Sequence, residues 1–167
     1  MRPMLFTLAA MTFLGLSTIA RAEDGPTEIA VAKLPKKLAA ILEVKYPAAQ
    51  LVAAYKDVDD DETFYSIALT YKKHEYEVTI TSHGEIVETT KALTAKDLPD
   101  VVQKTLQAKH KNAKVKSATE VREVAQKIQR SFHVEVEAGS AVIEIVFDVQ
   151  GKILSEENVT NATERKK

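Results

Sequence analysis

The chain has 167 residues, of which 23 are Lys or Arg and 24 are Asp or Glu, and its formal net charge is −1. This balance does not favour nucleic acid as a partner, because phosphate backbones are bound by basic faces. The sequence contains no cysteine, so a packed core rather than disulfides must stabilise the fold, and a structural zinc site would lack thiolate ligands.

The first 22 residues are predicted to be a secretory signal peptide. Arg2 precedes an apolar run from Met4 to about Leu16, and Ala20-Arg21-Ala22 is typical of a cleavage site. The run is shorter than the roughly 18 to 20 apolar residues that span a bilayer, which favours cleavage over an anchor. Cleavage leaves 145 residues with 21 basic and 24 acidic side chains, a net charge of −3. We expect export to a bacterial periplasm or medium, no membrane span in the mature chain, and a flexible start over residues 23–32.

The first helix is predicted to run from Leu34 to about Tyr46. Pro35 is tolerated in its first turn, because the missing N–H would have no partner there. Pro47 disfavours helical dihedrals in the residue before it and should end the helix. The helix carries one apolar stripe, with side chains at i, i+4, i+7 and i+8: Leu34, Leu38, Ile41 and Leu42.

After this helix the apolar period changes from 3.6 to 2, which predicts strands. One strand should run from Gln50 to about Val58. Two later segments alternate apolar and polar residues, with Tyr65, Ile67, Leu69 and Tyr71 in one and Tyr76, Val78 and Ile80 in the other. Polar turns are expected at Lys72-Lys73 and at His83-Gly84, where a fourth strand follows. Residues 33–93 therefore read as one helix lying on one face of a four-stranded antiparallel sheet.

Residues 94–157 repeat this pattern. Leu98-Pro99 aligns with Leu34-Pro35 at an offset of 64, and "QGKILS" from Gln150 aligns with "HGEIVE" from His83 at an offset of 67. The three extra residues fall between Glu120 and Ser131, in a turn where added length costs little loop entropy. Asp97 is placed to cap the second helix.

The predicted fold is thus α+β, with two tandem repeats that each pack one helix on a four-stranded antiparallel sheet. A single unit of this size buries too small a fraction of its surface to be comfortably stable. We therefore expect the repeats to pack together, either as one continuous eight-stranded sheet or as two sheets side by side. Residues 158–167 are polar and lack periodicity, which predicts a disordered tail.

Two motifs in this pattern resemble the PepSY-like domains, which share a fold with beta-lactamase inhibitory protein. One is the helix-ending "YPAA" from Tyr46, and the other is the late hairpin from Phe147 to Ile153, "FDVQGKI". The first copy has no aspartate in its hairpin, and the second lacks the proline. The resemblance covers Leu34 to Glu156 and implies an exported binding or inhibitory module that has no established catalytic residue and no cofactor.

The sequence offers no convincing reaction chemistry. The series Asp57-x-Asp59-x-Asp61 imitates the start of a calcium loop, but Glu62 replaces the turn glycine and Ala68 the bidentate acid, so a solvated turn is the better interpretation. There is no G-x-S-x-G motif and no phosphate-cradling loop. The histidines form no metal-binding pair at helical spacing: His74, His83, His110 and His133. We expect no catalytic residue, no metal site and no cofactor.

The remaining candidate site is the sheet face opposite the helices. Side-chain alternation places eight predicted partner-binding residues there: Phe64, Glu75, Glu77, His133, Glu135, Glu137, Glu144 and Asp148. Like charges on adjacent strands are mildly destabilising, so folding alone does not explain their accumulation. We expect either an ordinary solvated face or a docking face for a basic protein in the cell envelope. The alternatives are a structural or chaperone-like protein that pairs extended peptides at a sheet edge, or a weak cation-binding protein.

Overall fold

The computed structural model describes residues 25–59, 62–124 and 128–160. They form an α+β fold in which two α-helices accompany one nine-stranded antiparallel sheet. The predicted signal peptide, residues 1–22, lies outside the described residues, as do residues 161–167 of the predicted tail.

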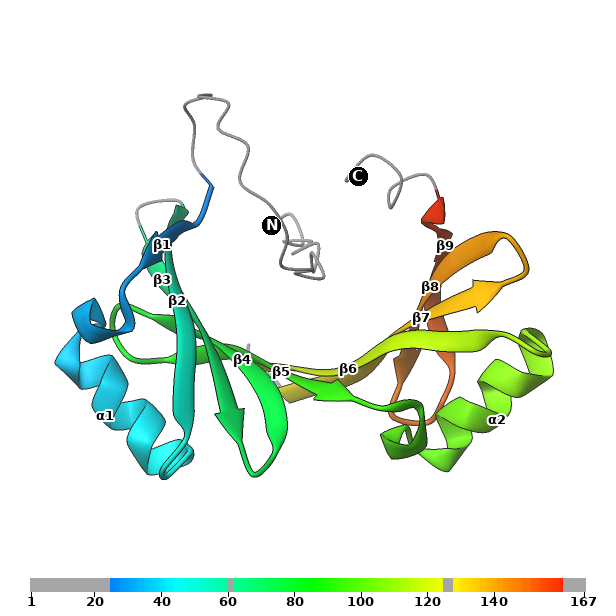
Figure 1. Ribbon diagram of the computed structural model, residues 1–167, viewed down its shortest axis with the longest axis horizontal. Coiled ribbons are helices and arrows are strands. Elements are labelled where there is room, and N and C mark those ends of the chain that lie inside the picture. Colours follow the sequence, from blue (N-terminus) through cyan, green and yellow to red (C-terminus); the bar gives the residue numbers. More distant parts are fainter. Residues whose placement is uncertain (1–24, 60–61, 125–127, 161–167) are drawn as a thin grey trace.

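The strands follow one another across the sheet in the order of the chain. They are β1 (Thr27–Ile29), β2 (Gln50–Asp59), β3 (Glu62–Tyr71), β4 (His74–Thr81), β5 (Ile86–Leu93), β6 (Lys114–Val124), β7 (Ile128–Ala138), β8 (Ala141–Asp148) and β9 (Ile153–Asn158). The helices are α1 (Lys36–Lys45) and α2 (Asp100–Lys109), and each is preceded by a short 3-10 turn, η1 (Val31–Lys33) or η2 (Ala95–Asp97). Figure 1 shows that the sheet is curved: β4, β5 and β6 form its middle, and its two ends rise on either side of them. Both helices lie on the outer, convex side of this curve.

Each helix buries its apolar stripe against the strands that follow it. Leu38 and Leu42 of α1 are buried in one core cluster together with side chains such as Ile67 of β3. Val102 and Leu106 of α2 are buried in a second cluster, which is built on β6, β7 and β8. The two clusters share no buried residue. Burial of the apolar stripe, worth about 1.5 to 3 kcal/mol for each fully buried side chain, is what holds these short helices in place.

The two halves of the sheet meet in one continuous sheet, one of the two arrangements expected from the sequence. Strands β5 and β6 pair over six registered positions, from Leu93 opposite Ala118 to Glu88 opposite Glu123. The sheet has nine strands rather than eight because β1 adds to the edge of β2.

The ends of the described chain differ from the flexible segments expected there. Ile29 of β1 lies opposite Ala54 of β2 and packs against the first core cluster. At the other end, β9 extends to Asn158, and the hydroxyl of Thr160 accepts a hydrogen bond from the Val142 N–H at 2.9 Å. In both places a strand edge supplies free backbone groups, and pairing with them orders a short segment that has little periodicity of its own.

The helix boundaries follow the prolines. Helix α1 ends at Lys45 with Tyr46 as C-cap, which confirms the stop predicted from Pro47. The prediction that Asp97 caps α2 is wrong. Its carboxylate instead accepts bonds within η2 from the backbone N–H of Thr94 at 3.0 Å and its hydroxyl at 2.6 Å. Leu98 is extended before Pro99, as residues before proline generally are, and this separates Asp97 from the start of the helix.

Local irregularities fall at matching places in the two halves. Residues after each helix adopt a left-handed conformation at Ala48 (φ 59) and Asn112 (φ 66). The strand register shifts at two positions in each half: Leu51/Ala53 and Thr79/Ile80 in the first, and Val115/Ser117 and Val146/Phe147 in the second.

Candidate functional site

The candidate site is the helix-free face of the sheet. Residues directly opposite on antiparallel strands point to the same face, and successive residues alternate. Ile67 and Val78 are opposite one another and buried in the first core, so their neighbours Ser66 and Thr79 project from the other face. The same alternation puts all eight predicted partner-binding residues on the helix-free face.

These eight residues form a band rather than a compact cluster. They lie on β3, β4, β7 and β8, and the two central strands β5 and β6 separate Glu77 from Glu135. With neighbouring strands about 4.8 Å apart, three steps from β4 to β7 amount to roughly 14 Å. A site that used all of them would therefore be a broad surface and not a pocket.

Two further acids fill the space between them. Glu88 of β5 and Glu123 of β6 lie directly opposite each other, and Glu77 is one strand away on the same face. We call Glu77, Glu88 and Glu123 the acidic centre. Burial raises the pKa of Glu88, and the charges of Glu123 and Glu77 raise it further. Neither Glu88 nor Glu123 has a basic partner within 4.0 Å among the described residues.

Sequence reasoning missed Glu88 and Glu123 because β5 and β6 are polar on both faces. On the helix side of these strands lie Thr89, Lys91 and Glu120, so the alternation of apolar residues that oriented the other strands is absent. The sequence predicts a strand from Lys114 to about Val124, which matches β6, but the pattern does not show which face of β5 or β6 each side chain occupies.

His133 lies near the predicted acid Glu144 and near Glu123. Its Nδ1 atom is 3.9 Å from a carboxylate oxygen of Glu144. Burial lowers the pKa of His133, while Glu144 and Glu123 oppose that effect. Glu144 lies opposite Glu135, but the Nζ atom of Lys116 is 2.6 Å from Glu135 and neutralises it. Glu135 is therefore neutralised, whereas Glu88 and Glu123 have no such partner among the described residues.

Asp148 already has a structural task. Its Oδ1 atom accepts hydrogen bonds from the backbone N–H groups of Gln150 and Lys152, both at 2.9 Å. These bonds close the turn between β8 and β9, in the hairpin that the sequence analysis singled out. Asp148 therefore offers a partner less hydrogen-bonding capacity than Glu88 and Glu123, which have no basic partner among the described residues.

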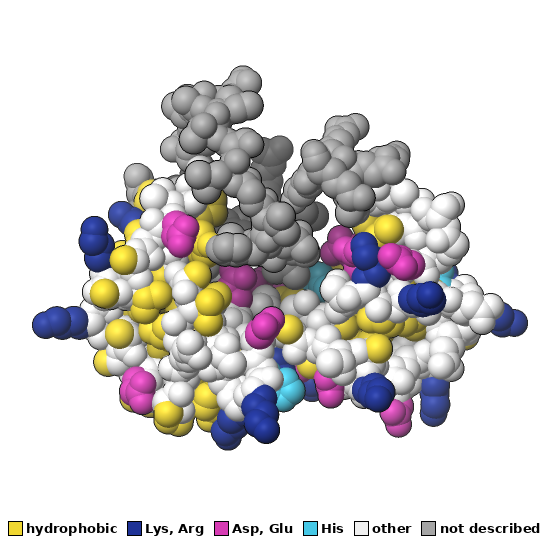
Figure 2. Space-filling view, in the orientation of Figure 1, with side chains coloured by type: hydrophobic (Ala, Val, Ile, Leu, Met, Phe, Trp, Pro, Cys, Tyr) yellow, Lys and Arg dark blue, Asp and Glu magenta, His cyan; other side chains and the backbone are white. Residues whose placement is uncertain are grey.

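Figure 2 shows acidic side chains near the centre of the molecule, in its upper part and along its lower edge, and Lys and Arg side chains mainly toward its two outer ends and its lower side. Within residues 25–59, 62–124 and 128–160, no group of three or more His, Asp or Glu side chains is arranged to hold a metal ion. The same ranges contain no helix of the length and apolarity that crossing a membrane requires. Asp61, part of the calcium-like series, lies outside the described residues.

Comparisons with known proteins give the fold. A DUF2874 family protein from Bacteroides uniformis has a TM-score of 0.63 and 22% identity, covering 75% of this chain and 90% of its own. A protein described as periplasmic from Bacteroides eggerthii has a TM-score of 0.63 and 20% identity, covering 76% and 90%. A BLIP-like protein from Bacteroides fragilis has a TM-score of 0.62 and 21% identity, covering 76% and 87%.

None of the curated proteins compared with the chain matches it. Two overlapping segments, residues 23–88 and 73–155, match the PepSY-like family, which is described as beta-lactamase-inhibitor-like. Together they span residues 23–155, well over half of the chain, and the resemblance seen in the sequence is confirmed. The chain therefore belongs to the PepSY-like family.

Proposed function

We propose that this protein is an exported, non-enzymatic binding module whose helix-free face docks on a basic surface of a protein partner in the cell envelope. The observation that carries the proposal is the pair Glu88 and Glu123, which face each other across β5 and β6 without a basic partner among the described residues. Directly opposed like charges cost about 0.2 to 1 kcal/mol of stability. A basic partner would remove that cost on binding.

The family supports the binding class of this proposal. The PepSY-like description is beta-lactamase-inhibitor-like, which is a non-catalytic type of function. The similar protein from Bacteroides eggerthii is described as periplasmic, which supports export, as does the predicted signal peptide. The partner itself is proposed only by its chemistry, as a surface rich in Lys or Arg.

The proposal includes a tandem duplication of one unit. Each half has the order 3-10 turn, helix and four strands. The register shifts at Leu51/Ala53 and Val115/Ser117 are 64 residues apart, and those at Thr79/Ile80 and Val146/Phe147 are 67 apart, as in the sequence alignment. Bulges are built features that persist within a structural family, so their repetition supports duplication.

The proposed docking face can be tested by site-specific photo-crosslinking in envelope extract. A photoreactive phenylalanine replaces Ser131, which lies opposite Asp148 on the helix-free face. Matched probes replace Lys104 on the exposed surface of α2 and Leu154 on the edge strand β9. We expect a specific adduct with a folded protein from Ser131 and none from Lys104. Adducts from Leu154 alone would instead support edge pairing with extended peptides.

Charge variants then test the chemistry with the captured partner. The double variant Glu88→Gln/Glu123→Gln should slow association by roughly 3-fold to 10-fold at low salt, and added salt should reduce the difference. Glu62→Gln/Glu85→Gln removes the same charge away from the acidic centre and should have a smaller effect. Equal effects of the two double variants would contradict docking on the acidic centre.

A further inference from the structure

A second polar site lies on the opposite, helix side of the sheet. It is a hollow of about 280 Å³ between the C-terminal end of α1 and strands β4, β5 and β6. Tyr46, Tyr76 and Thr89 contribute hydroxyl groups to its wall, and the charged residues of the wall are Lys45, Lys91, Glu120 and Arg122. We call it the basic pocket.

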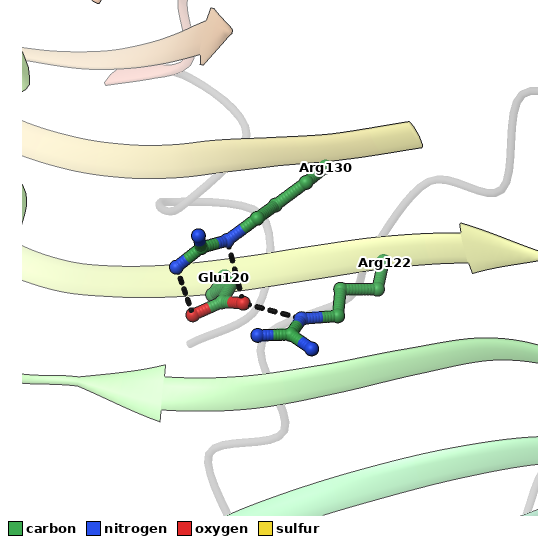
Figure 3. Close-up of polar contacts among 3 residues, drawn as sticks. All are labelled: Glu120, Arg122 and Arg130. Carbon is green, nitrogen blue, oxygen red and sulfur yellow. Dashed lines mark hydrogen bonds and ion pairs between the residues drawn. The ribbon is translucent and has the colours of Figure 1, made fainter. Parts of the chain in front are cut away.

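The single acid of the basic pocket is already neutralised. The Glu120 side chain is 8% exposed, and Figure 3 shows it held between two arginines. The Nε atom of Arg122 donates to it at 2.6 Å, and Arg130 donates through Nε at 2.8 Å and Nη2 at 3.1 Å. One carboxylate thus balances two guanidinium groups, so the lysines of the pocket add to an existing positive excess.

Lys45 and Lys91 have no carboxylate within 4.0 Å in the described parts of the chain. Burial lowers the pKa of Lys45, and the charge of Arg122 lowers it further, so these cations repel each other. The C-terminal end of α1 offsets part of the excess, since a helix end carries roughly half a negative charge. With Lys45, Lys91 and Arg122 against Glu120, the formal charge of the wall is +2, and the sum stays positive.

An unsatisfied hydroxyl points to a ligand independently of charge. The Oγ1 atom of Thr89 is buried and has no hydrogen-bond partner among the described residues, and the residue as a whole is 9% exposed. The Thr89 side chain opposes the rise that burial causes in the Tyr46 pKa, so the two hydroxyls are close to each other. Their geometry is not that of a hydrogen bond, and the Thr89 oxygen is left without a partner among the described residues. Buried polar groups without a partner are rare and call for an explanation.

We propose that the basic pocket binds a small oxyanion, the phosphate or carboxylate group of a small molecule, between Lys45, Lys91 and Arg122, with the Thr89 hydroxyl donating to it. The volume is just below the range of pockets for drug-sized ligands, so it suits a compact anion and not a folded partner. This site is on the other face of the sheet from the acidic centre and is independent of the proposed docking function.

The test is a ¹⁵N NMR titration of the chain without residues 1–22, using inorganic phosphate in one arm and succinate in the other. Sodium chloride keeps the ionic strength constant, because surface charge effects follow ionic strength. We expect saturable shifts of the Thr89–Lys91 and Glu120–Arg122 amides with at least one probe. Saturation by phosphate alone identifies a phosphate-bearing ligand, and saturation by succinate alone identifies a carboxylate-bearing one.

Two variants and one control locate the binding. Lys45→Gln/Lys91→Gln should weaken it by at least about fivefold, because two nearby charges are lost. Thr89→Val, which keeps the shape and removes the hydroxyl, should weaken it by about threefold or more. Lys36→Gln/Lys104→Gln removes the same charge from exposed helix positions and should leave it unchanged.

The proposal is overturned if the amide shifts saturate with neither probe. It is also overturned if Lys45→Gln/Lys91→Gln binds the probe as tightly as Lys36→Gln/Lys104→Gln does. A measurement without variants gives a second decision. Phosphate or succinate should raise the melting temperature of the wild-type chain above that in sodium chloride at equal ionic strength, because a ligand that binds only the folded state stabilises it. No rise with either anion would also overturn the proposal.

Discussion

Gly151 is the point where the β8–β9 turn touches helix α2, and replacing it with alanine should destabilise the fold. Its φ is +79°, in the left-handed region that favours glycine. An added Cβ would lie 2.7 Å from the carbonyl oxygen of Val101 and 2.8 Å from its carbonyl carbon. Neither the helix nor the turn can move apart easily to make room for the Cβ, because Val101 belongs to α2 and Asp148 holds the turn through its hydrogen bonds.

The cost can be estimated from three effects. A left-handed alanine costs about 1 to 2 kcal/mol, and overlap with a packed backbone adds about 1 to 3 kcal/mol. Alanine also restricts the unfolded chain more than glycine does, and this offsets about 0.4 to 1 kcal/mol of the loss. We therefore expect Gly151→Ala to lower the free energy of unfolding by about 1 to 4.6 kcal/mol.

Gly139 provides a matched control. It has a similar φ of +67°, but a Cβ there would meet nothing within 4 Å. Gly139→Ala should therefore show backbone strain alone, and the gap between the variants measures the contact with Val101. Gly84→Ala should fall between them, because its close contact is the Cδ1 atom of Ile41, which can rotate away. Urea denaturation monitored by circular dichroism measures the free energy of unfolding of all three variants. Equal losses for Gly151→Ala and Gly139→Ala would refute the reasoning.

Further variants test the charges and the core. Glu123→Gln should stabilise the fold by about 0.2 to 1 kcal/mol by removing repulsion with Glu88, and thermal melts in 1 M salt should show a smaller gain; a loss of stability would contradict the repulsion. Glu120→Gln should cost about 1.5 to 3 kcal/mol in urea denaturation, because bonds to two half-exposed arginines weaken. Burial raises the pKa of Glu120, but its hydrogen bonds with the two arginines outweigh that effect and hold the pKa below its usual value. The contribution of Glu120 to the stability of the fold is therefore present above the unfolded pKa and is lost as pH falls through the folded pKa. The stability gap between wild type and Glu120→Gln should therefore close in denaturation series from neutral pH to below pH ~4, and a gap that widened would rule out the pairing. Val102→Ala removes a side chain that is 0% exposed and should cost about 2 kcal/mol, whereas Val44→Ala, at a site 85% exposed, should stay within about 0.5 kcal/mol; equal losses in melts would contradict the packing of α2.

The strongly periodic segments could be predicted from the sequence. Leu38 and Leu42 define the buried face of α1, and alternation around Ile67 and Val78 fixes which faces of β3 and β4 are buried. The helix stop at Tyr46 follows from the restriction that Pro47 places on its predecessor. In each case the determinant is local: a repeat of apolar side chains or the backbone chemistry of one residue.

The parts that could not be predicted depend on long-range pairing. Strand β1 has three residues and forms because β2 offers it an edge. The union of both halves in one sheet rests on β5 meeting β6 across the intervening α2. The acidic centre follows from that same pairing, since Glu88 and Glu123 become neighbours only when these two strands are in register.

The strands lie in the sheet in the order of the chain, and this has a consequence for how the protein folds. Every strand pairs only with the strand before it and the strand after it in the sequence. A chain that folds from its amino-terminal end can therefore complete its first apolar cluster before α2 is available. Each later strand can then pair with a strand that has already formed. Short-range pairing of this kind favours rapid folding, and a protein without cysteine can finish it with no oxidation step.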